Sequence, residues 1–354
     1  MQWYPIRLST PVRQYAFGAR LIPELLGKLS DVEGTLAESW EVSDHASTEA
    51  TVVNGALSGT PFRELVRAHP GALVGAGWRG PRFPLLLKFL DASRRLPVHL
   101  HADAAVAAER YGEPNGKTEA WHIVWAAPGA SALVGVRPGL TDADLFDAFR
   151  AGAHAEVMFE APLTAGDTVY VPAGTLHTFG PGALVFEVQQ TSDLSQSVMP
   201  TDVYGRPLEA SVWDENIRRT LSELRREFRP APFPGLTLAE GGLTRTFACA
   251  GPHFALERWR FTSETTARVG PGRFLALTNL ADPVAVQATG GSEELPRGAT
   301  CLLPAALTRA LLVPHGTGDV LVSYVPDLAT DVIAPLLRAG HPPADVRRLG
   351  EVGL

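Results

Sequence analysis

The chain has 354 residues, of which 45% are hydrophobic and 19% charged, the balance of a globular protein with a sizeable core. Its 38 acidic residues outnumber its 31 lysines and arginines, and the net charge of −7 argues against nucleic acid or an acidic membrane surface as the main partner. The apolar runs are short and broken by charge, proline or glycine, so none is expected to span a bilayer. Two distant cysteines and an N-terminus without an apolar signal segment suggest a cytoplasmic protein.

Frequent glycines (34) and prolines (29) separate many short apolar runs, a pattern that favours an all-β sandwich or barrel. The predicted strands are residues 50–57, 97–102, 119–127, 167–173, 183–190, 245–250, 254–261, 273–280, 283–289 and 319–325. The predicted helices are residues 20–29, 61–69, 145–149 behind a Thr141–Asp144 cap, and 214–228.

A proline-rich segment follows the last of these helices and suggests a boundary near residue 230. We therefore predict a first domain over residues 1–229, with helical insertions, and a second domain over residues 230–354, with a C-terminal helix. The strand-rich part of the second domain, about 236–327, has no set of potential metal ligands like the one described next. Its His253 and Glu257 are interpreted as structural, and we expect a companion domain whose role is packing.

His99 and His101 stand two residues apart in a predicted strand. Side chains of a strand alternate between its faces, so both imidazoles point the same way and can reach one cation. Taken alone, a polar strand face explains this pair better than a metal site does. Glu119, at the start of the next strand, adds a candidate anionic ligand.

Residues 166–177 give a much more specific signal. They match the second cupin motif, in which a glycine turn, a short strand and a Pro-x-Gly bend lead to a histidine, here His177. Together His99, His101, Glu119 and His177 form a set of three histidines and one carboxylate. Such a set leaves positions on a metal open to water or substrate, as catalysis requires.

Glu187 lies in the middle of the apolar strand 183–190. A charge there is costly unless it faces a polar cavity, so Glu187 is a candidate acid or base. The alternative, a solvated glutamate on the outer face, remains open at this point.

In this order, the segments resemble the type I mannose-6-phosphate isomerase family, which consists of zinc-dependent cupins. The resemblance runs along nearly the whole chain and is most specific at residues 116–119 and 172–177. It implies two jelly-roll barrels and metal ligands at His99, His101, Glu119 and His177. It also implies an active-site lysine at Lys117, a strand glutamate at Glu187 and a motif acid at Asp193.

The chain departs from the family pattern at four positions. His99 replaces a glutamine, Ala102 a proline and Phe17 a tryptophan. Ser197 stands where the family has its catalytic arginine, and we consider Arg206, nine residues later, as a substitute that stabilises negative charge.

The resemblance implies isomerisation of mannose 6-phosphate to fructose 6-phosphate through a cis-enediol, with one zinc ion per chain. Iron, manganese or cobalt could also suit this ligand set. Two alternatives stay open: another reaction of a cupin metalloenzyme, such as an oxygenase, and a non-catalytic protein that binds sugar phosphates. The expected partner is a sugar phosphate, without nucleic acid or membrane, in a monomer or homodimer.

Overall fold

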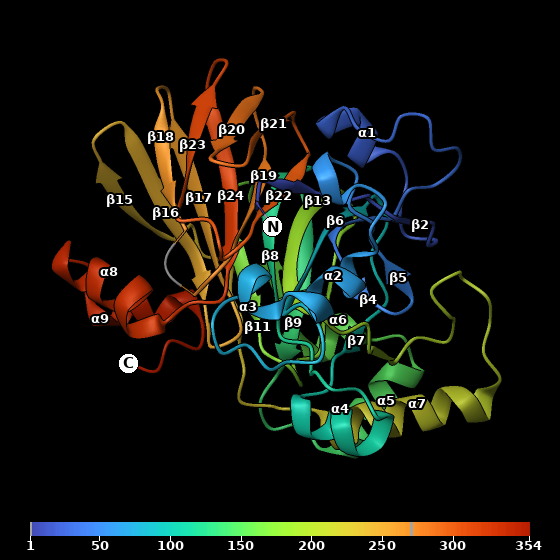
Figure 1. The fold of residues 1–354 in the computed structure, drawn as a ribbon. Coiled ribbons are helices and arrows are strands. Elements are labelled where there is room, and N and C mark those ends of the chain that lie inside the picture. Colours follow the sequence, from blue (N-terminus) through green and yellow to red (C-terminus); the bar gives the residue numbers. More distant parts are fainter. Residues whose placement is uncertain (1, 270–271) are drawn as a thin grey trace.

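The computed structural model describes residues 2–269 and 272–354 and consists mainly of β-strands, as predicted. Two strand-rich bodies lie side by side (Figure 1), one drawn mainly in blue to green and the other mainly in brown to red. Each body combines two antiparallel sheets. The predicted all-β fold, with two jelly-roll barrels and short helical additions, is therefore confirmed.

The first barrel consists of a six-stranded and a five-stranded sheet. In spatial order, the six-stranded sheet contains β11 (Thr168–Val171), β8 (Glu119–Ala126), β13 (Ala183–Gln190), β6 (Leu85–Ala92), β3 (Glu38–Val42) and β2 (Val12–Arg13). The five-stranded sheet contains β10 (Met158–Pro162), β9 (Ser131–Val136), β12 (His177–Phe179), β7 (His99–Leu100) and β14 (Gln196–Ser197). A small hairpin, β4 (Asp44–His45) and β5 (Thr48–Glu49), stands beside them.

The second barrel consists of a seven-stranded and a four-stranded sheet. The seven-stranded sheet contains β1 (Ile6–Arg7), β22 (Thr300–Leu303), β19 (Leu275–Asn279), β24 (Gly318–Tyr324), β17 (Ala255–Phe261), β16 (Leu243–Ala250) and β15 (Leu236–Glu240). The four-stranded sheet contains β18 (Thr265–Arg268), β23 (Arg309–Pro314), β20 (Val284–Ala288) and β21 (Gly291–Leu295). β1 comes from the N-terminus, so the chain begins in the second barrel's sheet before it builds the first. The division at residue 230 stays a prediction.

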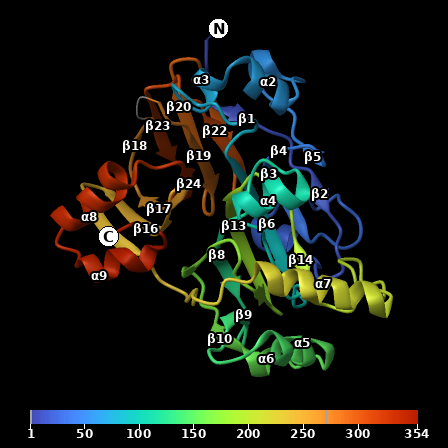
Figure 2. The same ribbon diagram turned by 90° about the horizontal axis from the view of Figure 1, so that it is seen from below.

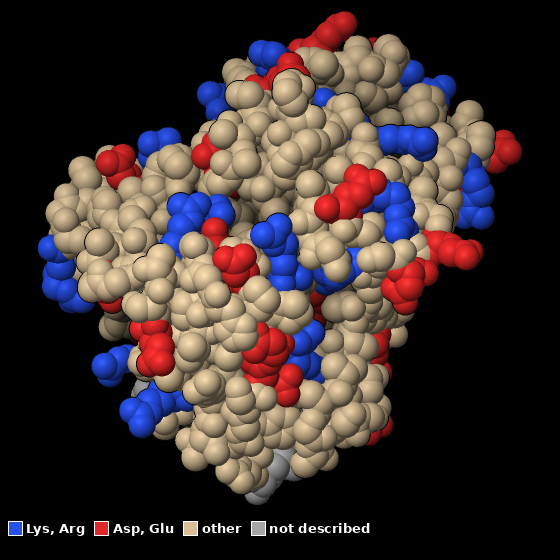
Figure 3. Space-filling view, turned by 90° about the horizontal axis from the view of Figure 1, so that it is seen from above, with Lys and Arg blue, Asp and Glu red and all other residues tan. Residues whose placement is uncertain are grey.

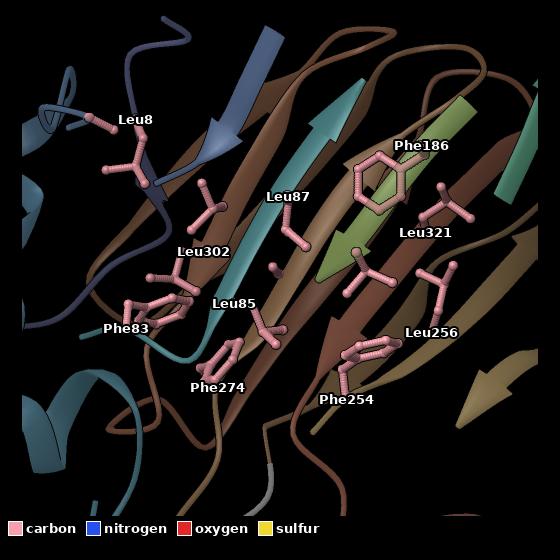
Figure 4. Packing of buried hydrophobic residues seen from close by; sticks show 14 of the residues in the cluster. Leu8, Phe83, Leu85, Leu87, Phe186, Phe254, Leu256, Phe274, Leu302 and Leu321 are labelled. Atoms are coloured by element: carbon pink, nitrogen blue, oxygen red, sulfur yellow. The ribbon is translucent and has the colours of Figure 1, made fainter. Parts of the chain in front are cut away.

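The two barrels share a hydrophobic core, because the strands of the six-stranded sheet present apolar side chains to the second barrel. Leu85 and Leu87 of β6 and Phe186 of β13 pack with residues of the second barrel such as Leu256 and Leu321 (Figure 4). Since side chains alternate along a strand, the residues between them, including Lys88 and Glu187, point to the interior of the first barrel. The two faces of one sheet thus serve different purposes, packing on one side and a polar cavity on the other.

The helices are short and lie at the periphery of the sheets (Figures 1 and 2). They are α1 (Leu21–Leu26), α2 (Phe62–Ala68), α3 (Pro70–Leu73), α4 (Ala104–Tyr111), α5 (Asp142–Arg150), α6 (His154–Val157), α7 (Ala210–Glu223), α8 (Ala334–Arg338) and α9 (Pro343–Val346), with 3₁₀ or π segments at Gly55–Leu57, Leu328–Ile333 and Arg347–Leu349. The predicted cap of α5 is confirmed, since Thr141 and Asp144 bond each other's backbone. Among the described residues, no helix has the length and apolar character needed to cross a membrane.

Two local predictions were wrong. The helix predicted to reach residue 228 ends at Glu223, because Arg225 turns away and donates its backbone N–H to Gly174, at 2.9 Å. The strand predicted at residues 50–57 is reduced to isolated bridges at Thr51 and Val52, followed by a 3₁₀ turn.

On the surface of the molecule, acidic and basic side chains are interspersed over the face shown in Figure 3.

Candidate metal centre and active site

Three histidines converge where β7 meets β12. His99 and His177 are direct cross-strand partners, and their ring centroids lie 4.3 Å apart. His101, just past the end of β7, brings its ring to 4.8 Å from that of His99 and 5.0 Å from that of His177. One potential ligand atom from each residue lies within 4.8 Å of the other two. The pairing register therefore gathers side chains that are distant in the sequence.

A backbone carbonyl orients each of the three rings. The Nδ1 atoms of His99, His101 and His177 lie 2.6, 2.6 and 2.8 Å from the carbonyl oxygens of Pro97, Leu194 and Thr175. An oxygen acceptor at Nδ1 places the ring proton there and leaves the lone pair on Nε2. All three histidines are thus held in the tautomer that can bind a metal through Nε2.

The bend in the 166–177 motif is hydrogen-bonded to the segment that carries His101. Gly174 has φ +85°, a conformation that side chains disfavour, and its backbone N–H donates to the carbonyl of His101 at 2.7 Å. This bond ties the turn that delivers His177 to the segment that carries His101. The motif therefore sets the spacing between two of the histidines.

Glu119, the first residue of β8, is buried beside the histidines. Its Oε1 accepts a hydrogen bond from the indole of Trp121, at 2.8 Å, and lies 3.1 Å from His177 Nε2. Its Oε2 lies 3.1 Å from His101 Nε2 and 2.8 Å from Lys117 Nζ. Burial opposes the ionisation of Glu119, but the ammonium of Lys117 outweighs it and holds the pKa of this carboxyl well below its usual range.

These residues fit a divalent metal ion. His177 Nε2 is buried and has no hydrogen-bond partner among the residues that the structure describes. Glu119 Oε2 is buried with only the Lys117 ammonium and His101 Nε2 beside it in the described part of the chain. Burial lowers the pKa of His101 to about 4 and that of His99 well below its usual value, so both rings are neutral and able to bind a metal at pH 7. Three imidazoles and one carboxylate match the ligands of a catalytic metal site.

A cavity of about 140 Å³ adjoins the metal ligands, and Lys117 and Glu187 both line it. Lys117 Nζ lies 3.7 Å from Glu187 Oε1 and 3.0 Å from His101 Nε2. Burial, reinforced by the charge of Glu119, raises the pKa of Glu187 to about 7. Glu187 therefore faces this cavity and not solvent, and it can exchange a proton near neutral pH.

Lys88 is a charged residue of this cavity that the sequence analysis missed. It is buried on β6, with Nζ 3.5 Å from Glu38, 3.7 Å from Asp193 and 3.8 Å from Glu187. Burial disfavours its charge, but the acidic neighbours prevail and raise the pKa of the ammonium. The signal was present in the sequence, because Lys88 interrupts the apolar run 85–92 just as Glu187 interrupts 183–190.

The structure does not bring Arg206 to this cavity. Its side chain is 72% exposed, and its guanidinium binds Asp202 at 2.7 Å within the same loop. Arg206 is therefore not in place to stabilise charge on a substrate, in contrast to the prediction. Ser197 does line the cavity, and its hydroxyl donates to the carbonyl of Val98 at 3.3 Å.

The chain is similar in sequence to known mannose-6-phosphate isomerases. Residues 6–125 match the family model "Phosphomannose isomerase type I, catalytic domain". A mannose-6-phosphate isomerase of Streptococcus mutans is 32% identical over 264 residues, which cover 73% of this chain and 79% of the relative. The putative mannose-6-phosphate isomerase YvyI of Bacillus subtilis is 32% identical over 56% of this chain and 61% of its own.

Solved structures give the same fold. The mannose 6-phosphate isomerase of Bacillus subtilis superposes with a TM-score of 0.80 at 26% identity, over 91% of this chain and 99% of that one. A putative mannosephosphate isomerase from Archaeoglobus fulgidus superposes with a TM-score of 0.72 over 92% and 98% of the two chains. At 21% identity, this second likeness supports the fold alone.

Proposed function

The chain belongs to the mannose-6-phosphate isomerase family, and from this premise we propose that it interconverts mannose 6-phosphate and fructose 6-phosphate. The observation that carries the proposal is the convergence of three Nε2 atoms and the Glu119 carboxylate beside a cavity that also contains Glu187, Lys88 and Lys117. A sugar phosphate is the substrate, and the predicted ligands, His99, His101, Glu119 and His177, hold one zinc ion.

A metal held by His99, His101, Glu119 and His177 would supply Lewis acidity toward a sugar oxygen and so make the neighbouring C–H bond more acidic. Glu187 is the proposed base. Its carboxylate takes the proton from C2 of the aldose and returns it to C1 of the enediol, while a hydroxyl proton moves from O2 to O1. A pKa of about 7 suits both directions of this transfer, because the group is partly protonated at neutral pH.

Lys88 and Lys117 provide positive charge on the wall of the cavity. Each lies within 4 Å of Glu187, so the two ammonium groups favour the ionised base. They also stabilise negative charge that develops on the sugar oxygens during enolisation. The buried position of both lysines excludes competing water and strengthens these interactions.

A coupled assay tests the proposal directly. Purified protein, stripped of metal and then loaded with zinc, should convert mannose 6-phosphate to fructose 6-phosphate, and His177→Ala should lose both metal and turnover. Absence of turnover with zinc, cobalt, manganese and iron would overturn the isomerase assignment. Bound iron with oxygen uptake in the presence of a sugar would point to an oxygenase instead.

A further inference from the structure

The cavity at the metal centre is too small for a whole sugar phosphate. Its volume of about 140 Å³ lies below the range of about 300–1,000 Å³ that ligand pockets usually have. A second cavity of about 460 Å³ adjoins it, and both are lined by Phe17, Leu96, Pro97 and Val203. A substrate whose reacting end lies at the metal centre can therefore extend into this second cavity, which we call the outer cavity.

The inner cavity also offers a phosphate little attraction. Its lining contains four carboxylates and two ammonium groups, namely Glu38, Glu119, Glu187 and Asp193, with Lys88 and Lys117. With all of them ionised, a divalent cation brings the inner cavity only to neutrality, and protonation of Glu187 adds a single positive charge. Ser197, which also lines the inner cavity, carries no charge. A phosphate dianion there would exchange its hydration for no net positive charge.

The outer cavity, by contrast, contains a guanidinium nitrogen that the described part of the protein does not use as a hydrogen-bond donor. Arg95 lines it and is anchored by Nη2, which donates to Ser131 Oγ at 3.0 Å. Arg95 Nη1 and His154 Nε2 are buried and have no hydrogen-bond partner within residues 2–269 and 272–354. Burial lowers the pKa of the Arg95 guanidinium, and Glu160 offsets this only in part. A buried donor without an acceptor is costly unless a ligand supplies one.

The acidic groups around the outer cavity leave Arg95 available. Glu160 lies close enough to Arg95 to raise its pKa, but within the described part of the chain its Oε1 accepts a hydrogen bond from Ser131, at 2.8 Å, and not from the guanidinium. Asp202 is already bound by Arg206. Arg94, exposed at the same wall, adds a second guanidinium and donates to the carbonyl of Ala16 at 3.1 Å.

We propose that the outer cavity, through Arg95 with Arg94 beside it, binds the phosphate of the substrate while the sugar's carbonyl end lies at the metal centre. The chain from Arg95 to His99 is four residues long and spans at most about 14 Å, so a molecule the length of a hexose phosphate can reach both. This assignment rests on the proposed function in taking a sugar phosphate as the ligand.

Arg95→Met tests the assignment, because methionine keeps the apolar stem and removes the donors. We expect the KM for mannose 6-phosphate and the inhibition constant of inorganic phosphate to rise together by about 10- to 100-fold, the range for one charge-assisted hydrogen bond. The kcat should change by less than about threefold, because the lost interaction is the same in ground and transition states. Arg95→Lys should recover part of the affinity, which a merely misfolded variant would not do.

Arg218→Met is the matched control, since it removes an exposed guanidinium of α7 that lines neither cavity and pairs with Asp214. An unchanged KM in Arg95→Met, or an equal rise in Arg218→Met, would overturn the assignment. If the zinc-loaded protein shows no turnover, calorimetry with inorganic phosphate still decides. Binding that weakens only in Arg95→Met would then support the phosphate site while the isomerase proposal fails, and equal binding in all variants would refute the phosphate site.

Discussion

The two barrels each bury a glutamate on a strand, and the two glutamates have different surroundings. Glu119 and Glu257 are both 1% exposed, and each accepts a hydrogen bond from the indole two residues later, Trp121 at 2.8 Å and Trp259 at 2.7 Å. In the second barrel, Arg245 donates twice to Glu257, at 2.8 and 2.9 Å, and Tyr324 adds a third bond at 2.6 Å. In the first barrel, the carboxylate faces histidines.

The difference shows why Glu257 has a structural role while Glu119, also buried on a strand beside an indole, can bind a metal. A guanidinium permanently supplies the cation that Glu257 needs, and its forked donors occupy both oxygens. Glu119 receives one indole hydrogen bond and the charge of a single lysine, and its two oxygens also face the Nε2 atoms of His177 and His101, each at 3.1 Å. The first barrel thus keeps a coordination position that the second has filled with a side chain.

The largest expected difference between the two barrels appears when the charge of each carboxylate is removed in turn. Glu119→Gln should lose its metal on dialysis, as measured by elemental analysis, and its kcat/KM should fall by about 10³-fold, since metal catalysis supplies several kcal/mol. Glu257→Gln should keep both the metal and most of the activity. Equal losses in the two variants would show that the second carboxylate is not merely structural.

The free energy of unfolding should respond in the opposite order. Glu257→Gln leaves Arg245 with the exposed Glu240, 3.4 Å away, as its acidic partner, and we expect a loss of about 3 kcal/mol, the lower end of the range for breaking a buried pair, because Arg245 is 21% exposed. Glu119→Gln, in metal-free protein, should change stability by less, because Lys117 keeps Glu187 as a partner at 3.7 Å and the repulsion between Glu119 and Glu187 is relieved. Urea unfolding monitored by circular dichroism measures both, and a larger loss in Glu119→Gln would contradict this order.

Lys88 of the first barrel can be compared with Arg245 of the second. Both are buried or half-buried cations paired with carboxylates, but Lys88 also lines a cavity. Lys88→Met should lower kcat by about 10²-fold, the effect of losing one electrostatic donor, while the metal content stays at the wild-type level. Parallel loss of metal would instead give Lys88 a role in holding the metal centre together.

The smallest effect is expected at the junction of the barrels, where His122 of β8 meets Arg258 of β17 at 3.4 Å. Burial, together with Arg258, lowers the pKa of His122 to about 3 in the folded protein, against 6.5 when unfolded. The contribution of His122 to the free energy of unfolding is therefore fully present above pH 6.5, and it is lost as the pH falls toward 3, because the unfolded chain takes up the proton first. Between pH 7.5 and 5.5 the loss should be about 1.4 kcal/mol.

His122→Gln isolates this contribution from that of the other histidines. Its unfolding free energy should decline less than that of the wild type over the same pH interval, by the amount given above. An identical decline in both proteins would mean that His122 does not titrate on unfolding as we expect.

The sequence was most informative where a local turn determines geometry. The glycine and proline positions of residues 166–177 predicted how His177 is delivered, and the spacing of His99 and His101 predicted a shared face. Arg206 was misplaced because nine residues of loop carry no directional information. Lys88 and Glu38 were missed because their partners come from other strands, and only the pairing of β6 with β3 and β13 brings those strands together.

One short sequence pattern recurs in both barrels. Glutamate followed two residues later by tryptophan occurs at Glu38–Trp40, Glu119–Trp121 and Glu257–Trp259, always within a strand. In each case the indole donates to the carboxylate, because residues two apart share a face. The pattern marks buried carboxylates held in a fixed orientation, and it separates them from acids on the surface.

The position of Trp121 has an optical consequence. Its indole bonds the Glu119 carboxylate, and its ring centroid lies 5.2 Å from that of His177, so it touches two of the proposed ligands. Trp259 stands in the same relation to a carboxylate whose partners do not change. Metal binding should therefore alter the fluorescence of one of these tryptophans and leave the other constant, which gives the protein a built-in spectroscopic reporter with its own internal reference.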